Sequence, residues 1–230
     1  MGAQQLIIIG DGETAELAYE YFTHDSPYTV AGFAVESAYK TKDEFFGLPV
    51  VDLEEIEAHY PPAEYDAFAA ISYTQLNRVR ERLFNALKAK GYTCASYVSS
   101  RAFVWHNVEI GENCFIFENN VIQYKVKIGN NVVLWSGNHI GHQSVIRDNV
   151  FISSHVVVSG YCDVGEYSFL GVNSSVANDV VIARDNLIAM GAVIHKSTEP
   201  RKIYKGNPAR PDETKDSFAV MKVTEPSESQ

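Results

Sequence analysis

The chain has 230 residues, 46% of them hydrophobic and 21% charged, as in an ordinary soluble globular protein with one large domain or two modest ones. Its formal net charge of −10 argues against nucleic acid or an anionic membrane surface as the main partner, although local basic patches for phosphate groups stay open. The three cysteines have no metal-type spacing, so we expect buried, reduced thiols.

The first residues, MGAQQLIIIG, lack the basic segment and the long apolar run of a secretory signal. No apolar run in the chain approaches the about eighteen residues that a membrane helix needs. We therefore expect a cytoplasmic protein without a membrane partner.

Strand-like and helix-like segments alternate over the first part of the chain. We predict strands at residues 5–9, 28–35, 47–51, 65–72 and 92–97, and helices at 14–22, 53–59 and 75–90. This β-α-β alternation indicates a small parallel sheet with helices on its faces, too short for a complete two-halved dinucleotide-binding fold.

From Val98 onward every sixth residue is Val, Ile or Leu, seventeen times in succession. The series is Val98, Val104, Ile110, Ile116, Ile122, Ile128, Leu134, Ile140, Ile146, Ile152, Val158, Val164, Leu170, Val176, Ile182, Ile188 and Ile194. Neither an α-helix nor an ordinary strand has this period. It predicts a hexapeptide-repeat coil with three short strands per turn of eighteen residues and one inward aliphatic side chain per strand.

Other residues of the hexads predict details of this coil. Glycine follows an inward aliphatic at Gly111, Gly129, Gly141, Gly165 and Gly171, where we expect a sharp turn in which a Cβ is a liability. Asn120 and Asn138 occupy inward positions eighteen residues apart, so we expect them to stack and form a ladder. Such coils usually pack as trimers, and outward apolar residues suit that assembly; examples are Phe117, Trp135 and Phe151.

The sequence thus divides into residues 1–97, the coil at 98–197, and a C-terminal cap and tail at 198–230. We expect the first unit to cap one open end of the coil and residues 198–211 to cover the other. From about Asp212 the sequence is charged and rich in Ser and Glu, which predicts a loosely held tail.

His142 is the strongest candidate for chemistry. It lies two residues after Ile140, at a corner of the coil, and Gly160, eighteen residues later, stacks over it. An imidazole beside an exposed glycine N–H supplies two needs of acyl transfer. The imidazole acts as a general base, which typically raises the rate about 10²–10⁴-fold. The N–H donates to the oxyanion and stabilises the transition state by about 3 kcal/mol.

The coil, the preceding β-α-β unit, the NHIGHQSVI stretch and the segment from Lys205 to Arg210 resemble the left-handed β-helix sugar acyltransferases of the hexapeptide family. Within that family the chain is similar to the bacillosamine-type and perosamine-type nucleotide-sugar N-acetyltransferases, and the resemblance covers about residues 5–211. It implies a Rossmann-like, nucleotide-sugar-binding first domain, a homotrimer, and transfer of acetyl from acetyl-CoA to a nucleotide-linked amino sugar in bacterial surface glycan (lipopolysaccharide, O-antigen) biosynthesis.

The resemblance also assigns residues. It makes His142 the general base and places Gly160 against the thioester carbonyl. The candidates for contacts with coenzyme A are Gly160, Asn178, Lys196, Lys205, Arg210 and His155. The candidates for substrate contacts are Gly10, Asp11 and Gly12, whose strand-to-helix turn can hold phosphate or ribose, together with Ser72, Tyr73, Asn77, Asn138 and Gln143.

Two departures from the family and three alternatives remain. Gln143 stands where some relatives have an acidic residue, and Phe151 where some have a second histidine; Glu13 at the first turn also repels phosphate. O-acetylation of a sugar hydroxyl and a non-catalytic scaffold both fit the hexads. A zinc hydrolase would use His106 and His142, but Arg147 stands where the third imidazole would be, so we expect no metal.

Overall fold

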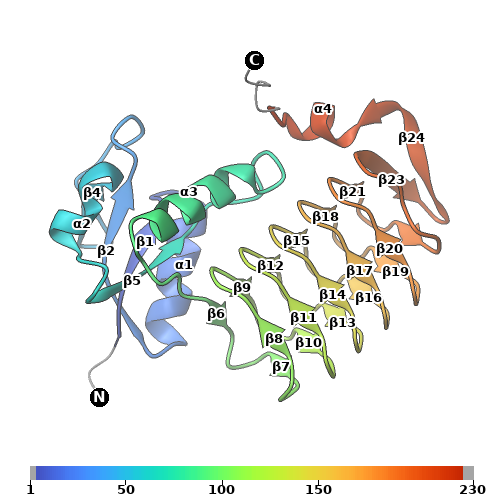
Figure 1. The fold of residues 1–230 in the computed structure, drawn as a ribbon, viewed down its shortest axis with the longest axis horizontal. Coiled ribbons are helices and arrows are strands. Elements are labelled where there is room, and N and C mark those ends of the chain that lie inside the picture. Colours follow the sequence, from blue (N-terminus) through green and yellow to red (C-terminus); the bar gives the residue numbers. More distant parts are fainter. Residues whose placement is uncertain (1–3, 225–230) are drawn as a thin grey trace.

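The computed structural model describes residues 4–224, and its N-terminal unit (residues 4–96) is a five-stranded sheet in the order β3-β4-β2-β1-β5 with helices around it (Figure 1). The elements are β1 (Gln4–Ile9), α1 (Glu13–His24), β2 (Tyr28–Val35), β3 (Glu44–Phe45), β4 (Leu48–Asp52), the 3₁₀ helix η1 (Leu53–Glu55), α2 (Ile56–His59), β5 (Tyr65–Ala69) and α3 (Arg78–Ala89). Neighbouring strands pair in parallel except β3 and β4, which form an antiparallel edge. The predicted small parallel sheet is confirmed, with this added edge strand.

Two predicted elements of the N-terminal unit are wrong in part. No strand covers 92–97 as a whole, because only an isolated bridge from Cys94 to Ala67 extends the sheet there. The helix predicted from residue 75 begins at Arg78, because Gln75, Leu76 and Asn77 have φ values of 53°, 52° and 64°. Three left-handed residues in a row cannot belong to a right-handed helix.

The coil follows directly and is a left-handed β-helix of two-residue strands, as the hexads predict (Figure 1). The strands are β6 (Tyr97–Val98), β7 (Phe103–Val104), β8 (Glu109–Ile110), β9 (Phe115–Ile116), β10 (Val121–Ile122), β11 (Lys127–Ile128), β12 (Val133–Leu134), β13 (His139–Ile140), β14 (Val145–Ile146), β15 (Phe151–Ile152), β16 (Val157–Val158), β17 (Asp163–Val164), β18 (Phe169–Leu170), β19 (Ser175–Val176), β20 (Val181–Ile182), β21 (Leu187–Ile188) and β22 (Val193–Ile194). They stack into three parallel sheets: face 1 (β6, β9, β12, β15, β18, β21), face 2 (β7, β10, β13, β16, β19, β22) and face 3 (β8, β11, β14, β17, β20).

The inward side chains form one apolar core along the coil. From Ile116 to Ile194 every sixth residue is at most 4% exposed, and burial of each such side chain contributes about 1.5–3 kcal/mol. The predicted close approach at the turn glycines is confirmed as well. A Cβ on Gly141 would lie 2.5 Å from the carbonyl carbon of Ser159 and 2.6 Å from the nitrogen of Gly160, so the next coil leaves no room for a side chain.

From residue 113 to residue 191, each corner of the coil contains a residue with left-handed backbone, which turns the chain from one face to the next. Asparagine, which tolerates this conformation better than most residues, occupies many of these positions. At the corner between faces 3 and 1, Asn113, Asn131 and Asn149 have φ of 55°, 60° and 62°. At the corner between faces 2 and 3, the equivalent residues include Gln143 and Tyr161, at 56° and 59°.

The N-terminal unit packs along face 1 instead of capping the end of the coil. Phe117 and Phe151, outward residues that we expected in a trimer contact, are 2% and 5% exposed and share a cluster with the sheet residue Phe68; Trp135 packs against the same cluster. The predicted role of these aromatics is therefore wrong, because they join the two parts of one chain. The first inward residues, Val98 among them, remain only partly buried.

A ladder of buried asparagines also joins the two units at the corner between faces 3 and 1. The Asn113 side chain donates to Asn131 Oδ1 and Asn131 to Asn149 Oδ1, both at 2.7 Å, and Asn149 donates to Glu81 Oε1 of α3 at 3.0 Å. The ladder predicted for Asn120 and Asn138 is wrong. Their side chains bond backbone carbonyls inside the coil, among them that of residue 135.

The C-terminal segment covers the far end of the coil and returns toward α3 (Figure 1). It consists of β23 (Lys202–Gly206), β24 (Ala209–Asp216) and α4 (Ser217–Met221). β23 pairs with β21, and Tyr204 joins the coil core, as we expected for this cap. The predicted loose tail is wrong up to residue 224, since the Ser217 hydroxyl is buried and donates to the carbonyl oxygen of Asp185; residues 225–230 lie outside the described part.

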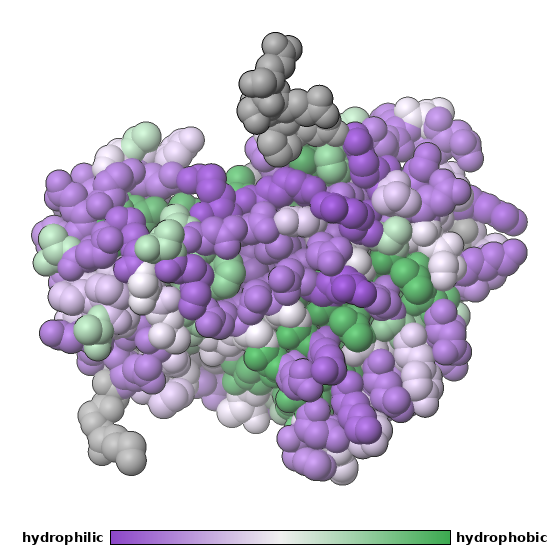
Figure 2. All heavy atoms as spheres, in the orientation of Figure 1, coloured by the Kyte–Doolittle hydropathy of each residue, from purple (hydrophilic) through white to green (hydrophobic). Residues whose placement is uncertain are grey.

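Apolar surface remains on the coil outside the contact with the N-terminal unit. Figure 2 shows the larger apolar patches over the coil, while the surface of the N-terminal unit is mainly hydrophilic. On face 2, Phe103 and Val157 point outward and are 52% and 43% exposed. None of the helices described between residues 4 and 224 is long and apolar enough to cross a membrane.

Candidate active site

His142 lies at the corner between faces 2 and 3, between β13 and β14, with its side chain exposed. Its imidazole occupies the space that a side chain of Gly160 would take: a Cβ there would lie 2.5 Å from Cε1 and 2.7 Å from Nε2. The backbone N–H of His142 donates to Gln123 Oε1 at 3.0 Å. Neither ring nitrogen forms a hydrogen bond within residues 4–224, so the imidazole is available as a proton acceptor.

Gly160 differs from its predicted state in one respect. It is buried, and its N–H donates to Asn178 Oδ1 at 3.0 Å, so it is not the exposed donor that we expected. Asn178 itself is exposed and stands one coil further along the same corner. An acyl carbonyl can reach the Gly160 N–H only if the Asn178 side chain turns away.

Tyr161 is the neighbour of His142 that the sequence did not indicate. Their ring centroids are 4.9 Å apart at an interplanar angle of 83°, and the Tyr161 N–H donates to the His142 carbonyl oxygen at 3.0 Å. The eighteen-residue period would have found it, because Tyr161 stacks over Gln143, the residue next to His142.

Of the two substrate candidates near His142, one is exposed and the other is buried. Gln143 is exposed at the same corner and borders a cavity of about 480 Å³ on face 3. Asn138 is 1% exposed and lies inside the coil, where its Oδ1 accepts the N–H of Val156 at 2.7 Å. It cannot contact a substrate, so that assignment is wrong.

The coenzyme A candidates are spread over three places. Lys196 is exposed and shares the corner of Asn178, eighteen residues on. Lys205 and Arg210 face each other as partners on β23 and β24, and Lys205 is paired with Asp212, whose pKa is well below its usual range because of that bond. His155 stands at another corner, between faces 1 and 2, with its ring over Gly137.

A second candidate site is a cavity of about 520 Å³ at the carboxyl ends of β1, β2 and β5. The predicted residues Gly10, Asp11, Gly12 and Ser72 line it, as does Glu36, which directly follows β2. This edge of a parallel sheet is where such folds commonly bind ligands. That rule would have found Glu36, which the sequence reading missed.

The charges around this cavity are mostly acidic. Asp11, Glu13 and Glu36 line it together with one cation, Arg82. Lys42 pairs with Asp11 at 3.7 Å from outside the lining. Arg82 holds Glu36 in a two-bond ion pair at 2.6 and 2.8 Å, which raises the pKa of the guanidinium. Carboxylates favour hydroxyl and N–H donors over phosphate, so the polar groups here suit a ribose or a base.

Tyr73 and Asn77 do not line this cavity, which corrects their assignment. The Tyr73 ring packs against Phe151 and Phe169 of face 1, at centroid distances of 5.2 and 5.1 Å. The left-handed turn before α3 directs Asn77 to the coil, where its side chain donates to the Asn149 carbonyl at 2.8 Å and is 1% exposed.

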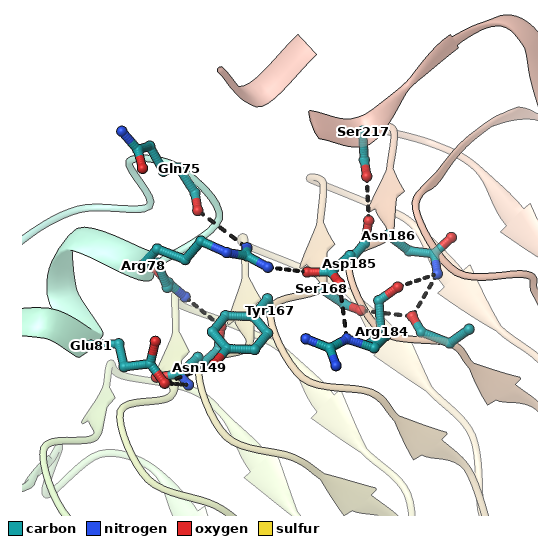
Figure 3. A network of polar contacts seen from close by, with 12 residues as sticks. Gln75, Arg78, Glu81, Asn149, Tyr167, Ser168, Arg184, Asp185, Asn186 and Ser217 are labelled. Atoms are coloured by element: carbon teal, nitrogen blue, oxygen red, sulfur yellow. Dashed lines mark hydrogen bonds and ion pairs between the residues drawn. The ribbon is translucent and has the colours of Figure 1, made fainter. Parts of the chain in front are cut away.

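A larger cleft of about 990 Å³ borders the first cavity and shares Tyr39 and Arg82 with it. Figure 3 shows its floor, where Arg78 reaches from α3 to Asp185 on the coil at 2.6 Å. The Arg78 guanidinium lies 4.2 Å from the Tyr167 ring centroid and 4.9 Å from that of Phe218. The cleft thus combines arginine and aromatic side chains from three parts of the chain.

The cysteines and metal candidates add no chemistry. Cys94, Cys114 and Cys162 are free and buried as expected, and burial raises the pKa of Cys94 to about 12 and of Cys114 to about 11, so neither is a ready nucleophile. Among residues 4–224 no group of three or more His, Cys, Asp or Glu side chains could hold a metal ion. Arg147, at the position that a zinc site would need, is bonded to Asp163 at 2.7 Å.

Comparisons with known proteins agree with this fold. Residues 125–160 match the family model for the bacterial transferase hexapeptide (six repeats). A stretch of 71 residues is 32% identical to the mitochondrial gamma carbonic anhydrase 1 of Arabidopsis thaliana. That match covers 30% of the chain and only 26% of the relative, so it concerns a segment of each protein.

Several solved structures match nearly the whole chain. Perosamine N-acetyltransferase from Caulobacter crescentus, in complex with CoA and GDP-perosamine, superimposes with a TM-score of 0.80 and 22% identity over 90% of this chain and 96% of that one. The acetyltransferase domain of PglB from Neisseria gonorrhoeae, in complex with acetyl coenzyme A, superimposes with a TM-score of 0.81 and 21% identity. The match covers 91% of this chain and 100% of that one. The chain therefore has the fold of these proteins: a small N-terminal sheet followed by a hexapeptide-repeat coil.

Proposed function

We propose that the protein is an acetyl-CoA-dependent N-acetyltransferase acting on a nucleotide-linked amino sugar. The observation that carries the proposal is the placement of the His142 imidazole, free of hydrogen bonds within residues 4–224, in the space above Gly160 at a coil corner. The fold shared with structures that hold CoA, acetyl coenzyme A and GDP-perosamine supports the same reaction.

In the proposed reaction the sugar amine attacks the thioester carbonyl carbon directly. His142 accepts the proton that the nitrogen loses, and the C–S bond breaks as the tetrahedral species collapses. The His142 imidazolium returns that proton to the departing sulfur, so coenzyme A leaves as the thiol. Gly160 provides the space for the imidazole, and its N–H stabilises the oxyanion once Asn178 has released it. Lys196, Lys205 and Arg210 are our candidates for the coenzyme phosphates, and His155 is a further candidate for a coenzyme contact.

The nucleotide-linked sugar would bind in the cavity of the N-terminal unit. Its acidic side chains, Asp11 and Glu36, would accept hydrogen bonds from ribose and base. The arginines of the neighbouring cleft, Arg78 and Arg82, would then lie beside the diphosphate.

We further propose a homotrimer, because the two sites lie on opposite sides of one protomer. The N-terminal unit covers face 1, and the corner of His142 is the one opposite that face. A sugar bound to one protomer would thus meet His142 of a neighbour. The outward residues of face 2, Phe103 and Val157 among them, offer the apolar surface for this contact.

The free, buried cysteines are consistent with the reducing cytoplasm, where acetyl-CoA and nucleotide sugars are found, and we place the enzyme there, in surface glycan biosynthesis.

The test is to incubate the protein with acetyl-CoA and a panel of UDP-, GDP- and dTDP-linked sugars, amino and non-amino, and to follow thiol release. We expect release with amino sugars only, reduced by about 10²-fold or more in His142→Ala. The matched control is His106→Ala, an exposed histidine at the same corner two coils away, which should retain activity. Release only with hydroxyl acceptors would establish O-acetylation instead, and no release with failure to bind coenzyme A would leave a scaffold.

A further inference from the structure

The polar contacts of His142 fix its backbone but leave its ring free. Gln123 accepts the His142 N–H, and no hydrogen bond orients either ring nitrogen within residues 4–224. In the part of the chain that the structure describes, Gln143, which stands beside His142, forms a hydrogen bond only through its backbone N–H, to the carbonyl of Tyr124 at 2.8 Å. Another contact must therefore select the orientation of the imidazole.

Tyr161 provides that contact. Its ring meets the imidazole nearly at right angles, with centroids 4.9 Å apart, while Gly160 borders the Nδ1–Cε1–Nε2 edge of the ring. The imidazole is thus held between a glycine surface on one side and a phenol ring on another. Edge-to-face packing of this kind favours one ring orientation over the alternatives.

Tyr161 also has a backbone conformation that is unusual for an aromatic residue. Its φ is 59°, in the left-handed region where a bulky side chain is uncommon. The equivalent left-handed residues at the same corner are Lys125, Gln143 and Asp179. Tyr161 is therefore the residue of this row that brings an aromatic ring to His142. Tyr167, a further tyrosine with left-handed backbone, likewise makes a side-chain contact beyond the turn, since its hydroxyl donates to Glu81 of α3 at 2.7 Å.

We propose that Tyr161 is a positioning residue that orients the His142 imidazole for proton transfer through ring contact. The inference rests on the proposed function. An exposed histidine has several staggered rotamers, and the observed one keeps the ring in the space above Gly160. The Gln143 side chain forms no hydrogen bond to the imidazole within the described residues, so the aromatic contact is what holds the base.

The kinetic test compares Tyr161→Leu with Tyr161→Phe. The leucine variant removes the ring, and we expect kcat to fall by about tenfold or more while KM for both substrates stays within about twofold. The phenylalanine variant keeps the ring without the hydroxyl, and its kcat should stay within about twofold of the unmodified protein. Tyr124→Leu is the matched control, because Tyr124 is an exposed tyrosine at the same corner, 43% exposed, on the other side of His142.

A second readout does not depend on activity. The Cε1–H resonances of the seven histidines can be followed by NMR, with the signal of His142 identified by its loss in His142→Ala. Tyr161→Leu should move that signal alone, because the ring current of the phenol acts on the adjacent imidazole, and Tyr161→Phe should largely preserve it.

The outcomes separate the inference from the proposed function. Unchanged kcat in Tyr161→Leu, or a rise in KM for acetyl-CoA alone, would overturn the positioning role, and the latter would make Tyr161 a contact of the cosubstrate. An inactive unmodified protein would refute the proposed function instead. In that case the NMR experiment still decides whether Tyr161 orients the ring, and an unmoved His142 signal counts against it.

Discussion

The His142 imidazole fills the place where a side chain on Gly160 would lie, with Cε1 2.5 Å from the position of a Cβ. Gly160 is therefore required for space and not for backbone conformation. Any larger residue must displace the imidazole, which is the movable partner because it stands at an exposed corner.

We expect Gly160→Ala to lower kcat by about 10²-fold, since a catalytic group displaced by about 1 Å loses that much of its effect. The free energy of unfolding should change by less than about 1 kcal/mol, because an exposed side chain gives way more easily than a packed core. Steady-state kinetics and urea unfolding check the two parts. Glu166→Ala, at the corner between faces 3 and 1, is the control, and a Gly160→Ala enzyme with full kcat would contradict the site.

Gly141→Ala tests the same kind of crowding against a partner that cannot move. Here the Cβ would lie 2.5 Å from the Ser159 carbonyl carbon and 2.6 Å from the Gly160 nitrogen, which belong to the stacked backbone of the next coil. We expect a loss of about 1–3 kcal/mol in the free energy of unfolding. Urea titration measures it, and a loss smaller than that of Gly160→Ala would show that the coil spacing is more adaptable than the structure indicates.

The hexads determined much of this site in advance, because a coil of constant period converts sequence distance into position. Eighteen residues separate His142 from Gly160, so their stacking follows from arithmetic alone. The hexads also place Asn138 at an inward position, so the period contradicts the substrate contact proposed for this residue. The structure agrees with the period, because Asn138 is buried inside the coil and its Oδ1 accepts the N–H of Val156.

The contacts between the N-terminal unit and the coil could not be predicted from the sequence. The left-handed turn at residues 75–77 moves Asn77 from the cavity to the coil, and nothing in its local sequence distinguishes it from the start of the following helix. Outward aromatics such as Phe117 fit either another copy or another part of the chain. Only the three-dimensional arrangement shows that face 1 is covered by the N-terminal unit.

Asn131→Ala tests the asparagine ladder. Asn131 is fully buried, accepts from Asn113 and donates to Asn149, so its loss leaves a buried donor and a buried acceptor without partners. We expect a loss of about 2–4 kcal/mol in the free energy of unfolding, from about 1–3 kcal/mol per unsatisfied group and the less suitable left-handed backbone.

Asn173→Ala is the matched control for the ladder, because Asn173 has a similar φ of 58° but is exposed. Its free energy of unfolding should fall only by the cost of placing alanine in a left-handed conformation, about 1 kcal/mol. Equal losses in the two variants, measured by urea unfolding, would mean that the ladder adds nothing to stability.

Asp25 gives a prediction about pH. At the end of α1 its carboxylate accepts the N–H of Ser100 at 2.9 Å and the hydroxyl of Tyr97 at 2.6 Å, and these bonds to the start of the coil lower the pKa of Asp25 to about 2. The folded pKa lies below the unfolded value of about 3.9. The charged carboxylate therefore stabilises the fold above about pH 4, and this contribution is lost as the pH falls toward 2.

We expect Asp25→Asn to lower the free energy of unfolding by about 1 kcal/mol at pH 7, a modest value because the group is near solvent. The difference from the unmodified protein should shrink between pH 4 and about pH 2, where half of the folded unmodified protein carries a neutral Asp25. Urea unfolding at pH 7 and pH 3 measures it. Asp43→Asn, whose carboxylate is 96% exposed, should change stability by less than about 0.5 kcal/mol at either pH, and a constant deficit in Asp25→Asn across this range would show that its bonds do not depend on the charge.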